Sequence, residues 1–249
     1  MAASSVRRHR AACDGGKRAT AARHVSLQLS HLLNLLRPHA HRFTKQKAKT
    51  NSHRLCVRQS SDKIRVSIRD VVRDDPTNNV LDSIFSKLGM QLHRRDHHPI
   101  GILKNAIYNY FDITYSGKFD KFDNLFPFVS VKMNFDDVLV REDHVSRSYN
   151  DTYYVDSQTV LRCHISAHQA ELLRKGHTHF LVTGDVYRRD SIDSTHRPVF
   201  HQMEGFRVFT PDDWEPSGMD GTSYVAEDLK KCLEDISRVG VCFLWNASV

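Results

Sequence analysis

The sequence predicts an α+β protein in which helices flank a mixed, mostly antiparallel sheet. Three observations support this prediction. Residues 184–209 contain two runs rich in β-branched and aromatic side chains, separated by a polar loop, which is typical of paired strands. Residues 98–111 and residues 224–238 each carry apolar side chains at helical spacing.

The N-terminal quarter differs sharply from the rest of the chain in charge. Residues 1–61 hold thirteen Lys or Arg and one acid, a net charge of +12, whereas residues 62–249 hold 23 basic and 28 acidic side chains, a net charge of −5. A leader rich in Arg, Ser, Ala and His and nearly free of acids is typical of an organellar transit peptide, expected to be disordered. The body is mildly acidic, so the pI near 9.2 does not indicate that the body binds RNA.

Within this leader, residues 25–36 contain a leucine cluster between two arginines and predict a short amphipathic helix. The run is too short to span a bilayer, and we expect no membrane partner. A basic arm that contacts RNA is the alternative interpretation. The five cysteines show no paired spacing, which fits a reducing compartment and disfavours disulfides or a zinc knuckle.

The first half of the body predicts a linker followed by helices. Residues 62–89 form the linker and a short helix at 80–88, closed by Gly89. Pro99 suits the first turn of a stronger helix, where its missing N–H costs nothing. The apolar face of that helix consists of Ile100, Leu103, Ile107, Tyr110 and Phe111.

The middle of the chain predicts extended structure at residues 122–140, 151–155 and 161–169. As a strand, the last of these would aim Arg162, His164 and Ser166 to one side. His164 and His168 are four residues apart, but no third ligand accompanies them, so we do not expect zinc. For the histidines near Pro99 we expect a solvated turn rather than a metal site: His93, His97 and His98.

The paired strands carry the most informative side chains. Strand alternation puts Arg188 and Asp190 on one face of the first strand. On the second strand it puts Gln202 and Glu204 on the face of Phe200, opposite a second set: Val199, His201 and Met203. A guanidinium binds phosphate oxygens in a bidentate fork, and a carboxylate with an amide oxygen suits an ammonium. The pattern therefore predicts a site where a zwitterion is joined to a phosphate.

The string VYRRD…DSTH…FHQMEG in this segment resembles motif 2 of class II aminoacyl-tRNA synthetases. It is similar in particular to phenylalanyl-tRNA synthetases of the single-chain organellar type found in plants. The resemblance runs from about residue 75 to residue 238 and implies a class II catalytic domain at residues 90–238. It also implies activation of phenylalanine with ATP and Mg²⁺, transfer to tRNA(Phe), and a location in mitochondria, chloroplasts or both.

By the same resemblance, Arg188 grips the α-phosphate of ATP and stabilises charge during attack by the amino-acid carboxylate. Asp190 and His196 lie in the loop that reaches the nucleotide, where Arg197 replaces a tyrosine common in the family. The expected substrate-binding residues are His164, Ser166, Gln169, Gln202 and Glu204. Surface polarity of the strand is the alternative for the last two residues, and an interstrand ion pair is the alternative for Arg188.

The resemblance stops at residue 238, and residues 239–249 form an unmatched tail. We therefore expect a truncated catalytic domain with unpaired sheet edges, poor stability and little adenylate formation. A non-catalytic isoform that binds tRNA or the full-length subunit is the main alternative, and a biotin or lipoate ligase is disfavoured by the wording of the motifs. The helix from Pro99 corresponds to the motif 1 helix, which in the family helps to form a subunit interface; an ordinary core-facing helix fits equally well. The sequence leaves the oligomeric state open.

Overall fold

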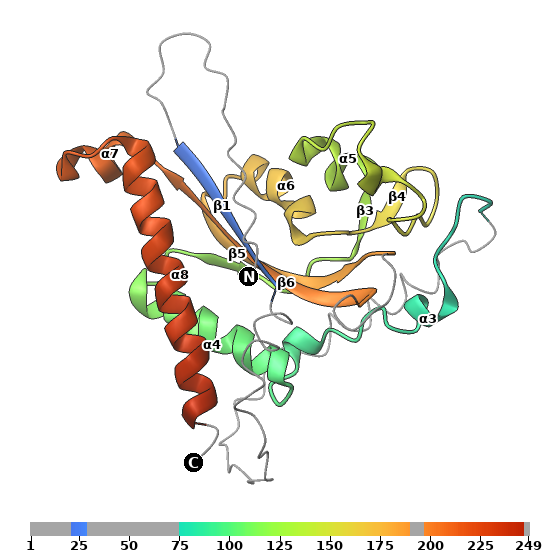
Figure 1. Ribbon diagram of the computed structural model, residues 1–249, viewed down its shortest axis with the longest axis horizontal. Helices are drawn as coiled ribbons and strands as arrows, with labels where there is room; N and C mark the ends of the chain where they lie inside the picture. The colour runs from blue at the N-terminus through green and yellow to red at the C-terminus, as the bar shows by residue number, and fades with distance from the viewer. Residues whose placement is uncertain (1–20, 29–74, 190–196, 247–249) are drawn as a thin grey trace.

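A computed structural model describes residues 21–28, 75–189 and 197–246 (Figure 1). The strands are β1 (Ala21–Gln28), β2 (Asp120–Phe122), β3 (Phe128–Ser130), β4 (Thr159–Leu161), β5 (His179–Tyr187) and β6 (Val199–Phe209). The α-helices are α3 (Asp82–Phe85), α4 (Pro99–Thr114), α5 (Val131–Asn134), α6 (Gln169–Arg174), α7 (Pro211–Trp214) and α8 (Gly221–Asn246). The 3-10 helices are η2 (Leu92–Arg94), η3 (Asp136–Val138), η4 (Val145–Arg147), η5 (Ile165–His168) and η6 (Glu215–Ser217).

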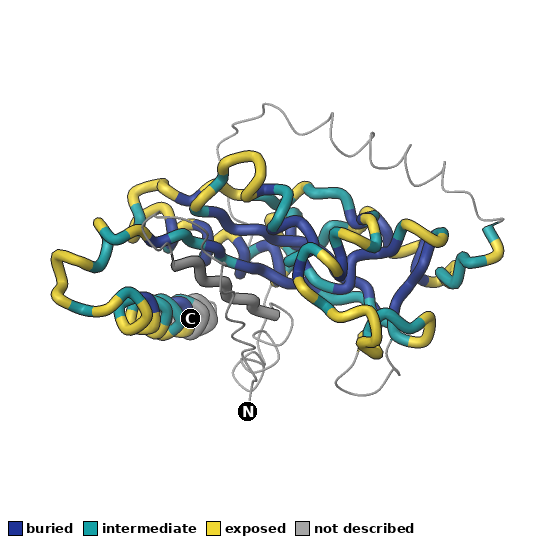
Figure 2. Tube along the Cα trace, turned by 90° about the horizontal axis from the view of Figure 1, so that it is seen from above, coloured by how far each residue is buried: buried dark blue, intermediate teal, exposed yellow. Residues whose placement is uncertain are grey.

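The main sheet has the strand order β1-β6-β5-β2, and β3 pairs with β4 in a separate two-stranded sheet. Among the described strands, only β2 and β5 pair in parallel. The predicted α+β fold with a mixed, mostly antiparallel sheet is therefore confirmed. The buried residues concentrate in the sheet and in the segments packed on it (Figure 2).

Strands β5 and β6 form the antiparallel pair predicted around the polar loop, with Gly184 opposite Gln202 and Val182 opposite Glu204. Both strands are longer than predicted, because β5 begins at His179 and β6 continues to Phe209. The apolar run 180–182 is buried on both faces, so it lacks the alternation that marks a half-exposed strand. Arg188 lies just beyond the end of β5 and is not part of the strand.

The outer edge of β6 is covered by β1, which pairs with residues 202–209. Two predictions are therefore wrong in this region. Residues 25–28 belong to a strand and not to the expected helix, and this edge of the sheet is not unpaired. An open strand edge presents free N–H and C=O groups, and an extended segment satisfies them. The other residues of the leader lie outside the described part of the chain.

Helix α4 matches its prediction closely. The Nδ1 atom of His98 accepts a hydrogen bond of 3.2 Å from the N–H of Ile100, and Pro99 occupies the first turn. The predicted apolar face is in the core, together with Ile236 of α8. The Tyr108 hydroxyl joins α4 to β5 through a 2.8 Å hydrogen bond to Thr183.

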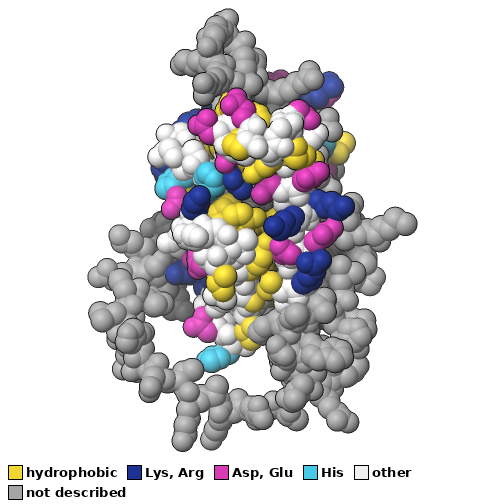
Figure 3. Space-filling view, turned by 90° about the vertical axis from the view of Figure 1, so that its left-hand side faces the viewer, with side chains coloured by type: hydrophobic (Ala, Val, Ile, Leu, Met, Phe, Trp, Pro, Cys, Tyr) yellow, Lys and Arg dark blue, Asp and Glu magenta, His cyan; other side chains and the backbone are white. Residues whose placement is uncertain are grey.

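Two other helices differ in length from their predictions. Helix α3 covers only residues 82–85 of the expected 80–88, and Gly89 follows with a positive φ of 75°. Helix α8 runs from Gly221 to Asn246, beyond both ends of the expected 224–238. An apolar cavity lies between α4, β6 and α8, lined by Phe111, Met203, Phe209 and Cys232 among others. Figure 3 shows hydrophobic side chains gathered along this side of the molecule, between charged ones.

The prediction of extended structure in the middle of the chain is largely wrong. Residues 151–155 contribute only an isolated bridge between Tyr154 and Val160. Tyr153 and Tyr154 are both buried, so successive side chains do not alternate between core and solvent as in a half-exposed strand. Residues 122–140 include β2 and β3 but then turn into α5 and η3. The turn is signalled by Ser130, whose hydroxyl accepts a hydrogen bond from the N–H of Met133 and caps α5.

Among the described residues, no helix combines the length and the hydropathy needed to cross a lipid bilayer.

Candidate amino-acid and nucleotide site

The centre of the candidate site is a contact between β6 and the 3-10 helix η5. The Ser166 hydroxyl donates a 2.5 Å hydrogen bond to Oε1 of Glu204. The N–H of Ile165 donates to Oε1 of Gln202 at 3.2 Å. Gln202 and Glu204 are each only 4% exposed, which excludes the alternative that they are surface polarity of the strand. A buried carboxylate and a buried amide oxygen beside a hydroxyl form an acceptor-rich corner suited to an ammonium.

The segment before this contact is not the predicted strand. Strand β4 ends at Leu161, and the chain passes into η5 at Ile165 and α6 at Gln169. The three side chains expected on one side therefore diverge. Arg162 reaches β5, His164 reaches the end of α5, and Ser166 reaches β6. The 3-10 turn brings Ser166 to Glu204, which a continuous strand would not do.

Arg188 contacts the same segment as this corner, at Cys163. Its Nε donates a 2.9 Å hydrogen bond to the carbonyl oxygen of Cys163, and its guanidinium lies 5.2 Å from the centre of the Phe200 ring. No described acceptor bonds its two terminal nitrogens, so the interstrand ion pair considered as an alternative is not seen among the described residues. A guanidinium held at Nε and over a ring keeps its outer fork available for phosphate oxygens.

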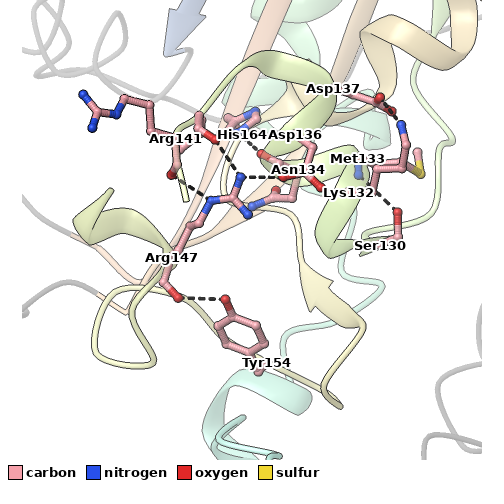
Figure 4. A network of polar contacts seen from close by, with 11 residues as sticks. Ser130, Lys132, Met133, Asn134, Asp136, Asp137, Arg141, Arg147, Tyr154 and His164 are labelled. Atoms are coloured by element: carbon pink, nitrogen blue, oxygen red, sulfur yellow. Dashed lines mark hydrogen bonds and ion pairs between the residues drawn. The ribbon is translucent and has the colours of Figure 1, made fainter. Parts of the chain in front are cut away.

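His164 is held by the loop that follows β3. Its Nε2 lies 2.9 Å from the backbone carbonyl oxygen of Asn134, the last residue of α5 (Figure 4). The side-chain oxygen of Asn134 accepts a 3.0 Å hydrogen bond from the N–H of Cys163. Arg147 ties this loop together, because its guanidinium donates to Asp136 and to two backbone carbonyls. The acceptor of His164 therefore lies at the end of α5, next to the segment that Arg147 holds together.

The remaining predicted site residues are not brought to this corner by the described contacts. Gln169 is buried, 7% exposed, at the first position of α6, and none of the described hydrogen bonds joins it to Ser166 or Glu204. Asp190 and His196 lie outside the described residues.

Sequence reasoning missed a buried charge network behind the site. Arg162 is 1% exposed and forms an ion pair with Asp185 at 2.6 Å. The other carboxylate oxygen of Asp185 accepts a 2.6 Å hydrogen bond from the Tyr187 hydroxyl. Burial raises the pKa of Asp185, but the Arg162 charge and the Tyr187 hydrogen bond outweigh it and hold that pKa below its usual value. Gly184, next to Asp185, was the available signal, since a glycine inside a buried strand indicates a close approach.

The histidines near Pro99 are not all in a solvated turn. His93 is 1% exposed, its Nε2 lies 2.8 Å from the carbonyl oxygen of Asp123, and its ring centre lies 5.3 Å from that of His201. Burial lowers the pKa of His93, and burial lowers the pKa of His201 to about 4. Both rings are therefore neutral at neutral pH, and the prediction of a solvated turn is wrong for His93.

The described residues contain no group of three or more His, Cys, Asp or Glu side chains that could hold a metal ion.

The family "tRNA synthetases class II core domain (F)" matches residues 85–213, which is 129 of the 249 residues. The chain belongs to this family. The match includes both β5 and β6, with the candidate site between them and η5.

Several curated relatives of this class II chain are named as organellar enzymes. The chain is 77% identical over 176 residues to "Phenylalanine--tRNA ligase, chloroplastic/mitochondrial" of Arabidopsis thaliana. The aligned region covers 70% of this chain and 41% of the relative. It is 45% identical over 181 residues to the mitochondrial phenylalanine–tRNA ligase of Dictyostelium discoideum, and this alignment covers 64% of the chain and 40% of the relative. The mitochondrial phenylalanine–tRNA ligase of Rattus norvegicus is 43% identical to the chain over 156 residues, and this alignment covers 61% of the chain and 33% of the relative. The chain thus spans less than half of the length of these relatives.

Proposed function

We propose that this chain is the N-terminal part of the catalytic domain of an organellar phenylalanine–tRNA ligase. Residues 90–238 form that part, residues 62–89 a linker with α3, residues 1–61 a transit peptide, and residues 239–249 a tail. The observation that supports the proposal best is the hydrogen bond between Ser166 and the buried Glu204, with Gln202 bonded to Ile165 and Arg188 bonded to Cys163. Acceptors for an ammonium and a guanidinium for phosphate oxygens thus contact the same segment, residues 163–166, as joining an amino acid to ATP requires.

The reaction follows from that arrangement. A carboxylate oxygen of phenylalanine attacks the α-phosphorus of ATP, the new P–O bond forms, and pyrophosphate leaves with the electrons of the broken bond. The approach of two anions is repulsive, and the outer nitrogens of Arg188 offset the charge that develops on the α-phosphate. Ser166, Gln202 and Glu204 hold the ammonium, so that the carboxylate faces the nucleotide. A terminal hydroxyl of tRNA(Phe) then displaces AMP from the adenylate.

ATP, phenylalanine and tRNA(Phe) are the proposed substrates, and Mg²⁺ would arrive bound to the phosphates of ATP. His164 and Gln169 would support the amino-acid end. Asp190 and His196 would contact the nucleotide. The proposed location is the mitochondrial matrix, the chloroplast stroma or both, supported by the names of the relatives and by the charge of the leader.

A second candidate is a non-catalytic form that binds tRNA or a full-length subunit. The observation that favours it is that the described residues contain the acceptors of the amino-acid corner, whereas the chain spans 41% of the length of the Arabidopsis relative. In this case the amino-acid corner would bind its ligand without efficient turnover, and adenylate formation would be weak.

A binding experiment and an exchange assay test these proposals on the 249-residue chain. Backbone amide shifts in ¹⁵N-labelled protein should report binding of L-phenylalanine and weaker binding of 3-phenylpropionate, which lacks the ammonium. Glu204→Gln should remove that preference, whereas Glu171→Gln, on the exposed side of α6, should keep it. Phenylalanine-dependent exchange of pyrophosphate into ATP would favour the catalytic form, and ligand preference without exchange would favour the binding form. Equal affinity of the wild-type chain for both ligands would contradict the proposed site.

A further inference from the structure

The edge of β5 changes its partner in the middle of the strand. Strand β2 pairs only with residues 180–182, so the edge of β5 beyond Val182 has no strand beside it in that ladder. In place of a strand, Arg162 forms hydrogen bonds with the backbone of β5 at this edge. Its carbonyl oxygen accepts a 3.0 Å hydrogen bond from the N–H of Tyr187, and its Nε donates at 2.6 Å to the carbonyl oxygen of Asp185. One residue thus satisfies the backbone of β5 from both its main chain and its side chain.

Nearly all N–H groups of the Arg162 guanidinium form hydrogen bonds in this position. Besides the bonds to Asp185, one terminal nitrogen donates to the carbonyl oxygen of Leu125 and to Nε2 of His168, each at 3.0 Å. Four of its five N–H groups therefore have partners. Burial and the Arg162 charge lower the pKa of His168 to about 3, so its ring is neutral and accepts at Nε2. Only the planar fork of an arginine reaches all these acceptors at once.

The space for this fork is provided by Gly184. A Cβ atom at that position would lie 2.3 Å from a terminal nitrogen of Arg162 and 3.0 Å from Cδ1 of Ile165. The missing side chain of Gly184 therefore lets the guanidinium and η5 lie directly on β5.

The residues that follow Arg162 carry the candidate site. The carbonyl oxygen of Cys163 holds Nε of Arg188, and Ser166 bonds Glu204. Resting on the function proposed above, we propose that Arg162, anchored by Asp185, is a positioning residue. It sets the place of residues 163–166, and through them the orientation of Arg188 and the ammonium corner. A buried ion pair is a poor source of net stability, because desolvation offsets its attraction. Its value here lies in the fixed geometry of its bonds.

Arg162→Lys tests this proposal because lysine keeps the charge but not the fork. The readout is the ratio of the dissociation constants of 3-phenylpropionate and L-phenylalanine, measured on the full chain. We expect the ratio to fall by about tenfold or more, the size of effect that the loss of one well-placed polar contact produces. A general loss of stability would weaken both ligands and leave the ratio unchanged. Tyr187→Phe, which removes one bond to Asp185 at nearly constant volume, should shift the ratio in the same direction by less.

Arg207→Lys is the matched control, because the guanidinium of Arg207 also bonds two carboxylates, Asp213 and Asp228, but on the side of β6 that faces α7 and α8. It should leave the ratio within twofold of the wild type.

Hydrogen exchange gives a second readout that needs no ligand. The N–H of Ile165 should exchange at least tenfold faster in Arg162→Lys, whereas the N–H of Val182 should keep its rate. An unchanged ratio together with an unchanged rate at Ile165 would overturn the positioning role. If the wild-type chain does not distinguish the two ligands, the proposed function fails, and exchange at Ile165 alone decides the role of Arg162.

Discussion

Ser166 and Glu204 are 38 positions apart in the sequence and are joined by a 2.5 Å hydrogen bond from the hydroxyl to Oε1. The bond links the 3-10 turn η5 to the centre of β6, and it places a buried carboxylate in the site. The two residues come from segments whose local structures differ, so their contact exists only in the folded domain.

Ser166→Ala should lower the free energy of unfolding by about 1–3 kcal/mol, because the buried carboxylate of Glu204 loses a donor. Urea titration followed by circular dichroism measures this difference. Ser237→Ala is the control, since the Ser237 hydroxyl bonds the carbonyl of Leu233 on the exposed side of α8. It should change stability by no more than about 0.5 kcal/mol. Equal effects of both changes would mean that the Ser166 bond contributes little.

Gly184→Ala should destabilise the chain by about 1–3 kcal/mol or more, because the added methyl group overlaps the guanidinium of Arg162. Gly205→Ala on the neighbouring strand is a suitable comparison. Its Cβ would meet Cδ2 of Leu181 at 3.4 Å, an ordinary contact distance. The two variants are compared by their midpoints of thermal unfolding, and a larger loss for Gly205→Ala would contradict the close approach at Gly184.

His168 should make the chain less stable in acid. Its pKa is about 3 in the folded state, against an ordinary value of 6.5. Below pH 6.5 the unfolded chain therefore binds a proton that the folded chain does not, and stability falls with decreasing pH until about pH 3. One such proton contributes a slope of up to about 1.4 kcal/mol per pH unit. His168→Gln should remove that contribution in urea titrations between pH 7 and pH 4.5, and parallel curves for both proteins would refute it.

Removal of residues 1–28 should promote self-association, because it uncovers the edge of β6 along residues 202–209. Light scattering coupled to gel filtration measures the mass in solution. Removal of residues 1–20 leaves β1 in place and serves as the control. If both shortened chains have the same mass distribution, the pairing of β1 with β6 does not protect the edge.

The sequence predicted best where one local pattern repeats. The spacing of Ile100, Leu103 and Ile107 identified α4, and alternation placed Gln202 and Glu204 on one face of β6. Both patterns reflect the burial of one face of a regular element.

Prediction failed where contacts between distant segments decide the structure. Residues 161–169 were expected to be a strand, because a single 3-10 turn has no periodic signal of its own. Arg162 was expected beside His164, although the acceptors that bury it are on β5 and on the segment before β3. The leucine spacing in residues 25–36 favoured a helix, but the backbone of β6 pairs with residues 21–28 instead.

The burial of Arg162 also makes a local turn depend on a strand that comes later in the sequence. Its guanidinium is buried together with Asp185, 23 positions further along the chain, and an unpaired guanidinium there would be costly. Residues 162–168 can therefore keep their native position only while β5 is in place. Because Ser166 belongs to this segment, its hydrogen bond to Glu204 depends on β5 in the same way.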